Sequence, residues 1–306
     1  MDVVELHRRA TEAFAALVGK VGADEWHRPT PCVGWDVRTL VNHVVGEERW
    51  VVPLMAGRTI ADVGTTLDGD LLGQDPASAT VHAAHAAQIA VVEPVLRRAK
   101  VQLSYGAEDA AEYVNQLIAD HLIHGWDLAS AIGADRRMDP VVVTAVAEWF
   151  ANREEIYRSS GAIGPRPAEE FADPADRLLA AFGRDPRWSP EHTVVAELAD
   201  AFARGDVDAI MALMTDDCVF ESTGPAPDGE RFEGTDAVRA QWTKIFDETT
   251  EPEFRTEEMV VRGDRAVLRW RYSWRNPDGS PGHVRGVDIM RLRGGRIAEK
   301  LSYVKG

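Results

Sequence analysis

The chain has 306 residues and is acidic, with 34 Lys plus Arg against 50 Asp plus Glu and a formal net charge of -16. An acidic surface repels phosphate backbones, so we expect no nucleic-acid partner. The sequence lacks an apolar run of bilayer length and does not open with a signal-peptide pattern, so we expect a cytoplasmic protein with no membrane partner.

The length is enough for two domains, each with its own hydrophobic core. Proline and glycine are dense between residues 159 and 190, which indicates a domain boundary there. We therefore expect one domain over residues 1–187 and a second over 188–306. The only two cysteines, Cys32 and Cys218, fall in different domains, so we expect no disulfide.

Apolar residues recur at helical spacing through most of the first domain. Asp36 is placed to cap the second of these helices. The expected helices cover residues 3–21, a segment that begins after Asp36, and residues 79–99, 108–132 and 141–157.

One predicted helix carries a carboxylate and an imidazole one turn apart, Asp120 and His124. His43 flanks the apolar stripe of its own helix in the same way, so helices packed by these stripes would bring the three side chains together. Two imidazoles and one carboxylate can bind a divalent metal ion and leave a coordination position open for water or substrate.

Alternatives remain at this point. A single Asp-x-x-x-His pair is more often a solvated or capping pair than a metal site. His121 lies nearer the middle of the apolar stripe, and it is either a buried core histidine or a ligand in place of Asp120. Cys32 is either a thiolate ligand or nucleophile or, as we favour, a small residue packed under its loop.

Several motifs together resemble the actinobacterial DinB-like family and, more narrowly, the metal-binding domain of mycothiol-dependent maleylpyruvate isomerases. They are TPCVGWDVR at 30–38, LVNH at 40–43, the Asp120 to His124 pair, GWDLA at 125–129 and GRDP at 183–186. The resemblance covers residues 1–187. It implies an all-α four-helix bundle.

The resemblance also implies a site for zinc or a similar divalent ion held by His43, Asp120 and His124, with mycothiol, a low-molecular-weight thiol, as co-substrate. The isomerases usually carry a glutamate where this chain has the shorter Asp120. In this family context Trp126 is expected to form a wall of the cofactor pocket, and a plain core tryptophan is the alternative.

The sequence pattern changes after Pro190, where two short helices are followed by strands with period-two alternation. The clearest strand, 268–275, carries aromatic residues on one face and mostly arginines on the other. Two more are expected at 284–292 and 297–304, and together these elements predict an α+β domain with a curved antiparallel sheet.

Motifs in this second domain resemble the SnoaL-like and ketosteroid-isomerase group of the nuclear transport factor 2 superfamily. They are GDVDAI at 205–210, TDDCVF at 215–220, FEG at 232–234 and GVDIMR at 286–291. The resemblance implies a cone-shaped α+β barrel. This superfamily hosts enzymes, binding proteins and dimerisation modules, so a homodimer through this domain is one expectation.

Two acids are catalytic candidates in this domain. Asp288 shares a strand face with apolar residues, which favours a neutral carboxyl that donates a hydrogen bond or acts in acid-base catalysis. Glu221 lies where ketosteroid isomerases place their catalytic base. For each of the two acids, the alternative is a strand-end carboxylate that is solvated or paired with a neighbouring arginine. Leu198 stands where those enzymes carry an oxyanion-hole tyrosine, so we favour ligand binding or a dimer interface over catalysis here.

These observations lead to a first hypothesis and two alternatives. The first is a metal-dependent, mycothiol-dependent isomerase or thiol transferase that acts on a small electrophilic molecule. The second is a non-catalytic small-molecule binding protein that uses an apolar cone around Trp270, Tyr272 and Trp274. The third is isomerase or cyclase chemistry through Glu221 and Asp288.

Overall fold

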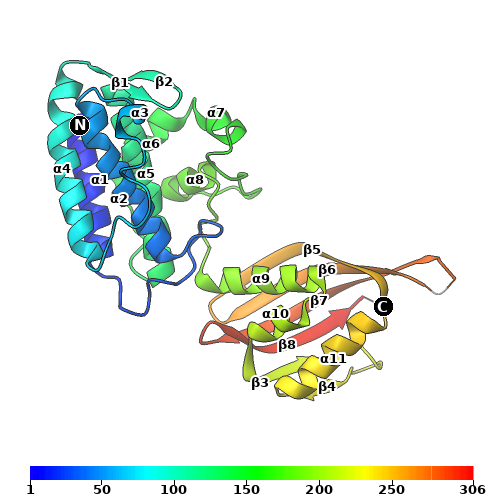
Figure 1. The fold of residues 1–306 in the computed structure, drawn as a ribbon. Coiled ribbons are helices and arrows are strands. Elements are labelled where there is room, and N and C mark those ends of the chain that lie inside the picture. The colour runs from blue at the N-terminus through cyan, green and yellow to red at the C-terminus, as the bar shows by residue number, and fades with distance from the viewer. Residues whose placement is uncertain (277, 306) are drawn as a thin grey trace. The chain divides into compact units, whose positions relative to one another are not determined.

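The computed structural model describes residues 1–276 and 278–305, which divide into a unit Met1–Trp188 and a unit that begins at Ser189 (Figure 1). The first unit is mostly helical, and the described part of the second combines three helices with a sheet. This order, a helical domain and then an α+β domain, confirms the fold class expected from the sequence.

Four long helices make up most of the first unit: α1 (Val3–Val18), α2 (Val37–Met55), α4 (Pro76–Leu96) and α5 (Ala110–Ile132). Helices α1 and α2 each pack against both α4 and α5. The Asp36 carboxylate accepts a hydrogen bond from the Thr39 amide at 2.8 Å, which confirms the predicted cap of α2. Almost every residue of α5 from Leu117 to Ala131 is buried, so its polar side chains must find partners inside the protein.

The remaining elements of this unit are short. They are α3 (Ile60–Val63), the antiparallel hairpin β1 (Lys100–Leu103) and β2 (Gly106–Asp109), α6 (Pro140–Phe150), α7 (Glu154–Ser159) and α8 (Pro174–Ala181). The sequence pattern missed the hairpin because its strands are only four residues long. The single helix expected over 141–157 is two helices, since the chain turns between Phe150 and Glu154.

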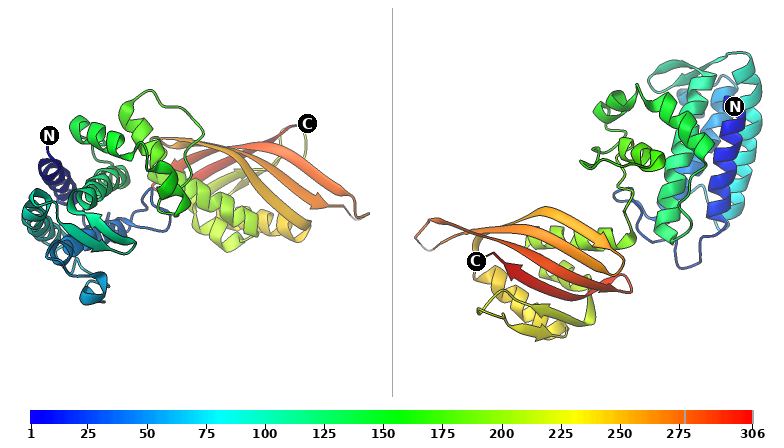
Figure 2. Two further views of the ribbon diagram at one scale, coloured as in Figure 1. Left: turned by 90° about the horizontal axis from the view of Figure 1, so that it is seen from above. Right: turned by 180° about the vertical axis from the view of Figure 1, so that it is seen from behind.

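The second unit has helices α9 (Pro190–Arg204), α10 (Val207–Ala212) and α11 (Thr235–Asp247) on one face of a curved sheet (Figure 2). The six strands formed by the described residues lie in the order β4-β3-β8-β7-β6-β5. All neighbours are antiparallel except β3 and β8. The strands are β3 (Met214–Glu221), β4 (Arg231–Glu233), β5 (Thr250–Arg262), β6 (Arg265–Arg275), β7 (Pro281–Arg293) and β8 (Arg296–Val304).

Alternate residues of β6, β7 and β8 are buried, as the period-two pattern predicts for a sheet covered on one face. Leu268, Met290 and Ile297 belong to this core, and Leu198 of α9 is fully buried within it. Three polar residues also occupy buried positions on the inner face: Asp288, Lys300 and Ser302. Among the helices of the described residues, none has both the length and the apolar character needed to cross a membrane.

Candidate functional site

A cavity of about 740 Å³ opens in the helical unit beside α2 and α5. The loop that precedes α2 supplies Cys32 and Trp35 to its wall, and segments 161–165 and 182–184 close other sides. His43, Asp120 and His124 all line this cavity. It is therefore the concave, mixed polar and apolar region in which a small-molecule site is expected.

The three predicted metal ligands lie close together at the cavity wall. The Nε2 atoms of His43 and His124 lie 3.4 and 3.3 Å, respectively, from the Oδ1 atom of Asp120. One donor atom from each residue lies within 4.8 Å of the other two. This arrangement follows from the one-turn spacing of Asp120 and His124 on α5 and from the packing of α2 against α5.

The same donor set fits a metal ion chemically. The second carboxylate oxygen of Asp120 is buried and has no hydrogen-bond partner among the described residues, although buried polar atoms are normally satisfied. Imidazole nitrogen and carboxylate oxygen are ligands that zinc and related divalent ions accept. The donor set is therefore one that a divalent cation accepts, and its carboxylate has an oxygen that the described residues leave without a partner.

Electrostatics within the group favours an ionised carboxylate. Burial alone would raise the pKa of Asp120, but the imidazoles of His124 and His43 hold that pKa well below its usual range. Burial would lower the pKa of His124, but the Asp120 carboxylate outweighs it and raises that pKa well above the usual value. Without a metal ion, the proton on His124 therefore occupies a position that a cation would compete for.

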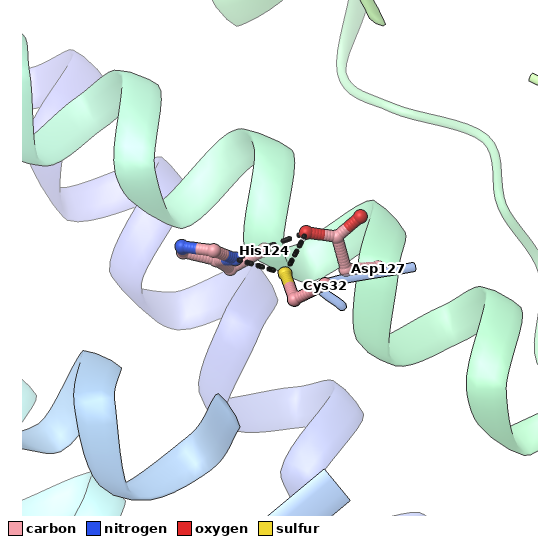
Figure 3. A group of neighbouring side chains, drawn as sticks. All are labelled: Cys32, His124 and Asp127. Atoms are coloured by element: carbon pink, nitrogen blue, oxygen red, sulfur yellow. Dashed lines mark hydrogen bonds and ion pairs between the residues drawn. The ribbon is translucent and has the colours of Figure 1, made fainter. Parts of the chain in front are cut away.

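A second layer of polar contacts orients His124. Its Nδ1 atom lies 3.0 Å from Oδ2 of Asp127, one turn farther along α5 (Figure 3). Arg184 donates to the same carboxylate from Nε at 3.0 Å and from Nη2 at 2.8 Å. Burial would raise the pKa of Asp127, but the Arg184 charge and the His124 contact lower it. An ionised Asp127 holds the Nδ1 proton and leaves Nε2 to face Asp120.

Cys32 belongs to this layer rather than to an apolar niche under its loop. Its Sγ atom donates to Asp127 Oδ2 at 3.2 Å and lies 3.7 Å from His124 Nδ1 (Figure 3). Arg184 Nη2 also lies 3.2 Å from this sulfur. Cys32, His124 and Asp127 form a second group of potential metal ligands. Their atoms already pair with one another and with Arg184, so the group that contains His43 is the better cation site.

His121 points away from the cavity. Its Nε2 atom lies 2.5 Å from Oε1 of Glu48, and its Nδ1 atom lies 2.7 Å from the Leu117 carbonyl oxygen. Both His121 and Glu48 are buried, and neither lines the cavity. His121 follows Asp120 by one residue and is therefore turned by about 100° around the helix. The structure thus places it as a paired core histidine and not as a substitute for Asp120.

Trp126 does not line the cavity, contrary to the expectation from the sequence. It follows His124 by two residues, which turns it by about 200° to the other side of α5. There it is buried in the core, and the Arg136 guanidinium carbon lies 5.8 Å from its ring centroid. The aromatic wall beside the proposed ligands is Trp35 instead, with ring centroids 5.0 Å from His43 and 5.8 Å from His124.

Sequence reasoning assigned no role to Glu47, which lines the cavity one turn after His43. Burial and the nearby negative charge of Asp120 raise the pKa of Glu47. Among the described residues it has no hydrogen bond or ion pair. The available signal was the four-residue spacing from His43, which puts both side chains on one helix face.

The two acids predicted in the second unit do not meet. Asp288 is buried on the inner face of the sheet, where Lys300 Nζ lies 2.9 Å from Oδ2 and Ser302 donates to Oδ1 at 2.7 Å. Glu221 follows the inward-facing Phe220 on β3, so it points to the other face and lies 3.7 Å from Arg231. The apolar surroundings expected for Asp288 therefore contain a cation, which is Lys300 and not the neighbouring arginine of the alternative interpretation.

Comparison with known proteins agrees with this division of the chain. Residues 7–129 match the mycothiol maleylpyruvate isomerase N-terminal domain, and residues 195–300 match the SnoaL-like domain. Both resemblances inferred from the motifs are thereby confirmed. Uncharacterized proteins of two Mycobacterium tuberculosis strains, CDC 1551 / Oshkosh and H37Rv, are each 32% identical over 202 residues, which is 61% of this chain and 100% of the relative.

Two solved structures are similar to part of this chain. An NTF2-like protein of unknown function from Mesorhizobium loti is 40% identical, with 38% of this chain and 91% of that chain covered and a TM-score of 0.34. A protein described as a SnoaL-like polyketide cyclase from Jannaschia sp. CCS1 is 20% identical, with 40% and 90% covered and a TM-score of 0.35.

Proposed function

The chain belongs to the family that carries the mycothiol maleylpyruvate isomerase N-terminal domain, here followed by a SnoaL-like domain, and we propose that it is a metal-dependent thiol-using enzyme. Its co-substrate would be a low-molecular-weight thiol, with mycothiol as the first choice. Its reaction would be isomerisation by reversible thiol addition, or thiol transfer, on a small electrophilic molecule. The approach of His43, Asp120 and His124 at the cavity wall carries the proposal.

In this proposal, His43 and His124 contribute nitrogen ligands and Asp120 contributes an oxygen ligand. A divalent cation held there, zinc in the first instance, would favour the thiolate form of a bound thiol at neutral pH. Asp127 and Arg184 fix the orientation of His124, and the fork of Arg184 keeps Asp127 ionised. Trp35 limits the access of water on one side of the group.

Glu47 is the candidate acceptor for the proton that a thiol loses. It faces the same cavity as the proposed ligands and is not used in another pair among the described residues. Its raised pKa lies closer to neutrality than that of an ordinary glutamate, which suits a group that must both take and return a proton. In an isomerisation by thiol addition, the same proton would be returned when the thiol leaves.

Acid-base chemistry through Glu221 and Asp288 receives less support. Their side chains lie on opposite faces of the sheet, so a single substrate cannot contact both. Asp288 is also held between Lys300 and Ser302. We therefore keep the proposed reaction in the helical unit.

Elemental analysis of the purified full chain tests the proposed ligands. We expect about one divalent ion per chain and its loss in the double variant His43→Ala, His124→Ala. The matched control is His82→Ala, His85→Ala, which removes two exposed histidines of α4 and should keep the ion. Unchanged metal content in the first variant would reject these ligands.

An activity screen tests the reaction class. Thiol consumption or isomerisation of maleylpyruvate-type electrophiles is followed with mycothiol, with another low-molecular-weight thiol and without thiol. We expect turnover that needs both the thiol and the metal ion. Turnover that survives both chelation and thiol omission would contradict the proposal.

A further inference from the structure

The cavity beside α2 and α5 extends away from the proposed metal ligands to an end with aromatic walls. Tyr113 lines it from α5, seven residues before Asp120, so the two side chains lie on nearly one helix face and about 10 Å apart along the axis. Trp149 of α6 and Tyr157 of α7 line the same cavity. Trp149 Nε1 donates to Oε1 of Glu112 at 3.0 Å, which places its ring beside Tyr113. We call Tyr113, Trp149 and Tyr157 the aromatic end of the cavity.

The hydroxyl group of Tyr113 is a buried donor at this end. The residue is 4% exposed, and its hydroxyl has no hydrogen-bond partner among the described residues. Burial and the nearby carboxylates, of which Glu47 is the foremost, raise the pKa of this hydroxyl, so it keeps its proton. Because an unsatisfied buried donor is costly, the aromatic end is suited to a molecule that brings an oxygen acceptor.

The rest of the aromatic end offers apolar surface. The indole N–H of Trp149 is taken by Glu112, and Arg153 donates to the same carboxylate from Nε at 2.9 Å. The ring centroids of Trp149 and Tyr157 lie 6.0 Å apart. Ile163 adds an aliphatic side chain from the loop after α7. An apolar wall with one unpaired donor suits a molecule with an apolar body and an oxygen atom.

The charges around the cavity disfavour an anion. Arg184 is the one lysine or arginine among the described residues that line the cavity, and its guanidinium is paired with Asp127. Glu47 and Asp120 line the cavity as well, and both are acidic. The proposed centre adds no surplus positive charge, since the Asp120 carboxylate and the thiolate of the co-substrate balance a divalent ion. A carboxylate on the substrate would therefore be buried without a cation, which is costly.

We propose that the electrophilic substrate of this cavity is an uncharged molecule with an apolar body and a carbonyl oxygen, and that the Tyr113 hydroxyl donates a hydrogen bond to this oxygen. The rings of Trp149 and Tyr157 pack against the apolar body. Tyr113 selects against a hydrocarbon, and the lack of an unpaired lysine or arginine in the described lining selects against a carboxylate. The inference rests on the proposed function for the reaction at the metal centre and names the substrate class of that reaction.

Isothermal titration calorimetry of the full chain tests the proposal with three unreactive probes of one skeleton: 4-phenylbutan-2-one, butylbenzene and 3-phenylpropanoate. The first carries a carbonyl group, the second a methylene group in its place, and the third a carboxylate. We expect the ketone to bind about fivefold more tightly than the hydrocarbon or better, because the hydrocarbon leaves the Tyr113 hydroxyl unpaired, and about tenfold more tightly than the carboxylate or better. Equal affinity for the ketone and either other probe, or no measurable binding of the ketone, would overturn the proposal.

The variant Tyr113→Phe keeps the ring and removes only the hydroxyl group. We expect it to bind the ketone and the hydrocarbon with similar affinity. The matched control Tyr303→Phe changes an exposed tyrosine of β8 that does not line this cavity, and it should keep the wild-type preference. The ratio of the two affinities is measured, so a general loosening of the fold does not imitate the result. A ketone preference that survives in Tyr113→Phe would overturn the assignment of this residue.

A second variant tests the location independently of the hydroxyl group. Ile163→Trp narrows the aromatic end from the loop after α7 and leaves Tyr113 in place. We expect it to lose affinity for the ketone about tenfold or more. Circular dichroism checks that each variant is folded, and unchanged affinity in a folded Ile163→Trp protein would place the ketone elsewhere and overturn the proposal.

Repeating the titrations after removal of metal ions with a chelator separates this inference from the proposed function. The comparison with 3-phenylpropanoate is made only in this metal-free protein, because a carboxylate can also bind a metal ion directly. A ketone preference that Tyr113→Phe removes would support the Tyr113 assignment even in a protein that holds no stoichiometric metal ion. A protein that binds the ion and turns over with thiol but shows no ketone preference would overturn this inference alone.

Discussion

The Nδ1 atom of His124 lies 3.0 Å from Oδ2 of Asp127, its neighbour three residues along α5. This contact decides which imidazole nitrogen faces the cavity, because a proton held between Nδ1 and the carboxylate leaves Nε2 to the side of Asp120. The buried Asp127 carboxylate does not line the cavity. It orients the imidazole of His124, which does. Arg184 keeps that carboxylate ionised from a loop beyond α8.

The Asp127 contact leads to a first prediction. Asp127→Asn removes the negative charge behind His124, and we expect metal affinity to fall about 10-fold to 100-fold, the usual effect of losing such a partner. Zinc affinity measured by competition with a chromophoric chelator checks this. Asp109→Asn, an exposed change at the start of the same helix, serves as the control and should keep wild-type affinity. Equal affinities in the two variants would contradict the orienting role.

Substitutions of Asp120 test whether metal binding depends on its carboxylate and on the length of its side chain. Asp120→Ala should lose the stoichiometric metal ion, because it removes the oxygen ligand between His43 and His124. Asp120→Glu should keep the ion, since it retains the carboxylate and matches the residue usual at this position in the related isomerases. Elemental analysis of both proteins checks the pair. Metal retained at wild-type level in Asp120→Ala would remove this residue from the ligand set.

Metal binding should depend on pH in a defined direction. The Asp120 charge raises the pKa of His124 well above 6.5, so the metal-free protein keeps a proton on His124 at pH values where an ordinary histidine has lost it. A cation at Nε2 must displace that proton, so affinity should rise with pH through the His124 pKa and fall as the pH drops below it.

Calorimetry in buffers with different ionisation enthalpies measures this proton release directly. At pH 7 we expect binding of the metal ion to release protons. Proton release of zero in wild type at pH 7 would contradict the electrostatic account.

Sequence spacing was sufficient to pair Asp120 with His124, because both lie on one helix and one turn apart. The apolar stripe beside His43 suggested that it joins them, and the family resemblance supported this choice, since periodicity gives the buried face of a helix but not its neighbour. Cys32 and Arg184 could not be joined in this way. They reach Asp127 from irregular segments 95 and 57 residues away in the chain, where no repeating pattern constrains a side chain.

Lys300 shows a different limit of prediction from the sequence. It lies between Ala298 and Ser302, which are both buried, so strict alternation along β8 puts it on the inner face. A lysine in a strand is nevertheless normally interpreted as solvent-exposed, and its partner Asp288 lies on the neighbouring strand. The strand register, which sequence alone did not provide, was needed to pair the two charges.

The two hydrogen bonds from Arg184 to Asp127 should contribute to the stability of the fold as well as to the geometry of the site. Arg184→Met leaves the fully buried Asp127 carboxylate with His124 as its remaining cationic partner. Loss of one partner from a buried pair typically costs about 3–5 kcal/mol, so we expect the free energy of unfolding to fall by an amount near the lower end of this range. Urea unfolding followed by circular dichroism measures the change in the helical unit. Arg137→Met, which removes an exposed partner of Asp135, should leave the urea transition unchanged. A matching small effect in both variants would show that the Asp127 pair is dispensable.

A substitution of Glu47 distinguishes two possible roles of this residue, metal ligand and proton acceptor. Glu47→Gln keeps the size and the cavity position of the side chain but cannot accept a proton from a thiol. If Glu47 is the acceptor, metal content should stay at the wild-type level while thiol-dependent turnover falls about 100-fold or more, as is usual for loss of a general base. The split between the two measurements is informative, because a metal ligand would lose both. Loss of the ion in Glu47→Gln would make Glu47 a fourth ligand, and full activity with the ion retained would exclude it from the proton transfer.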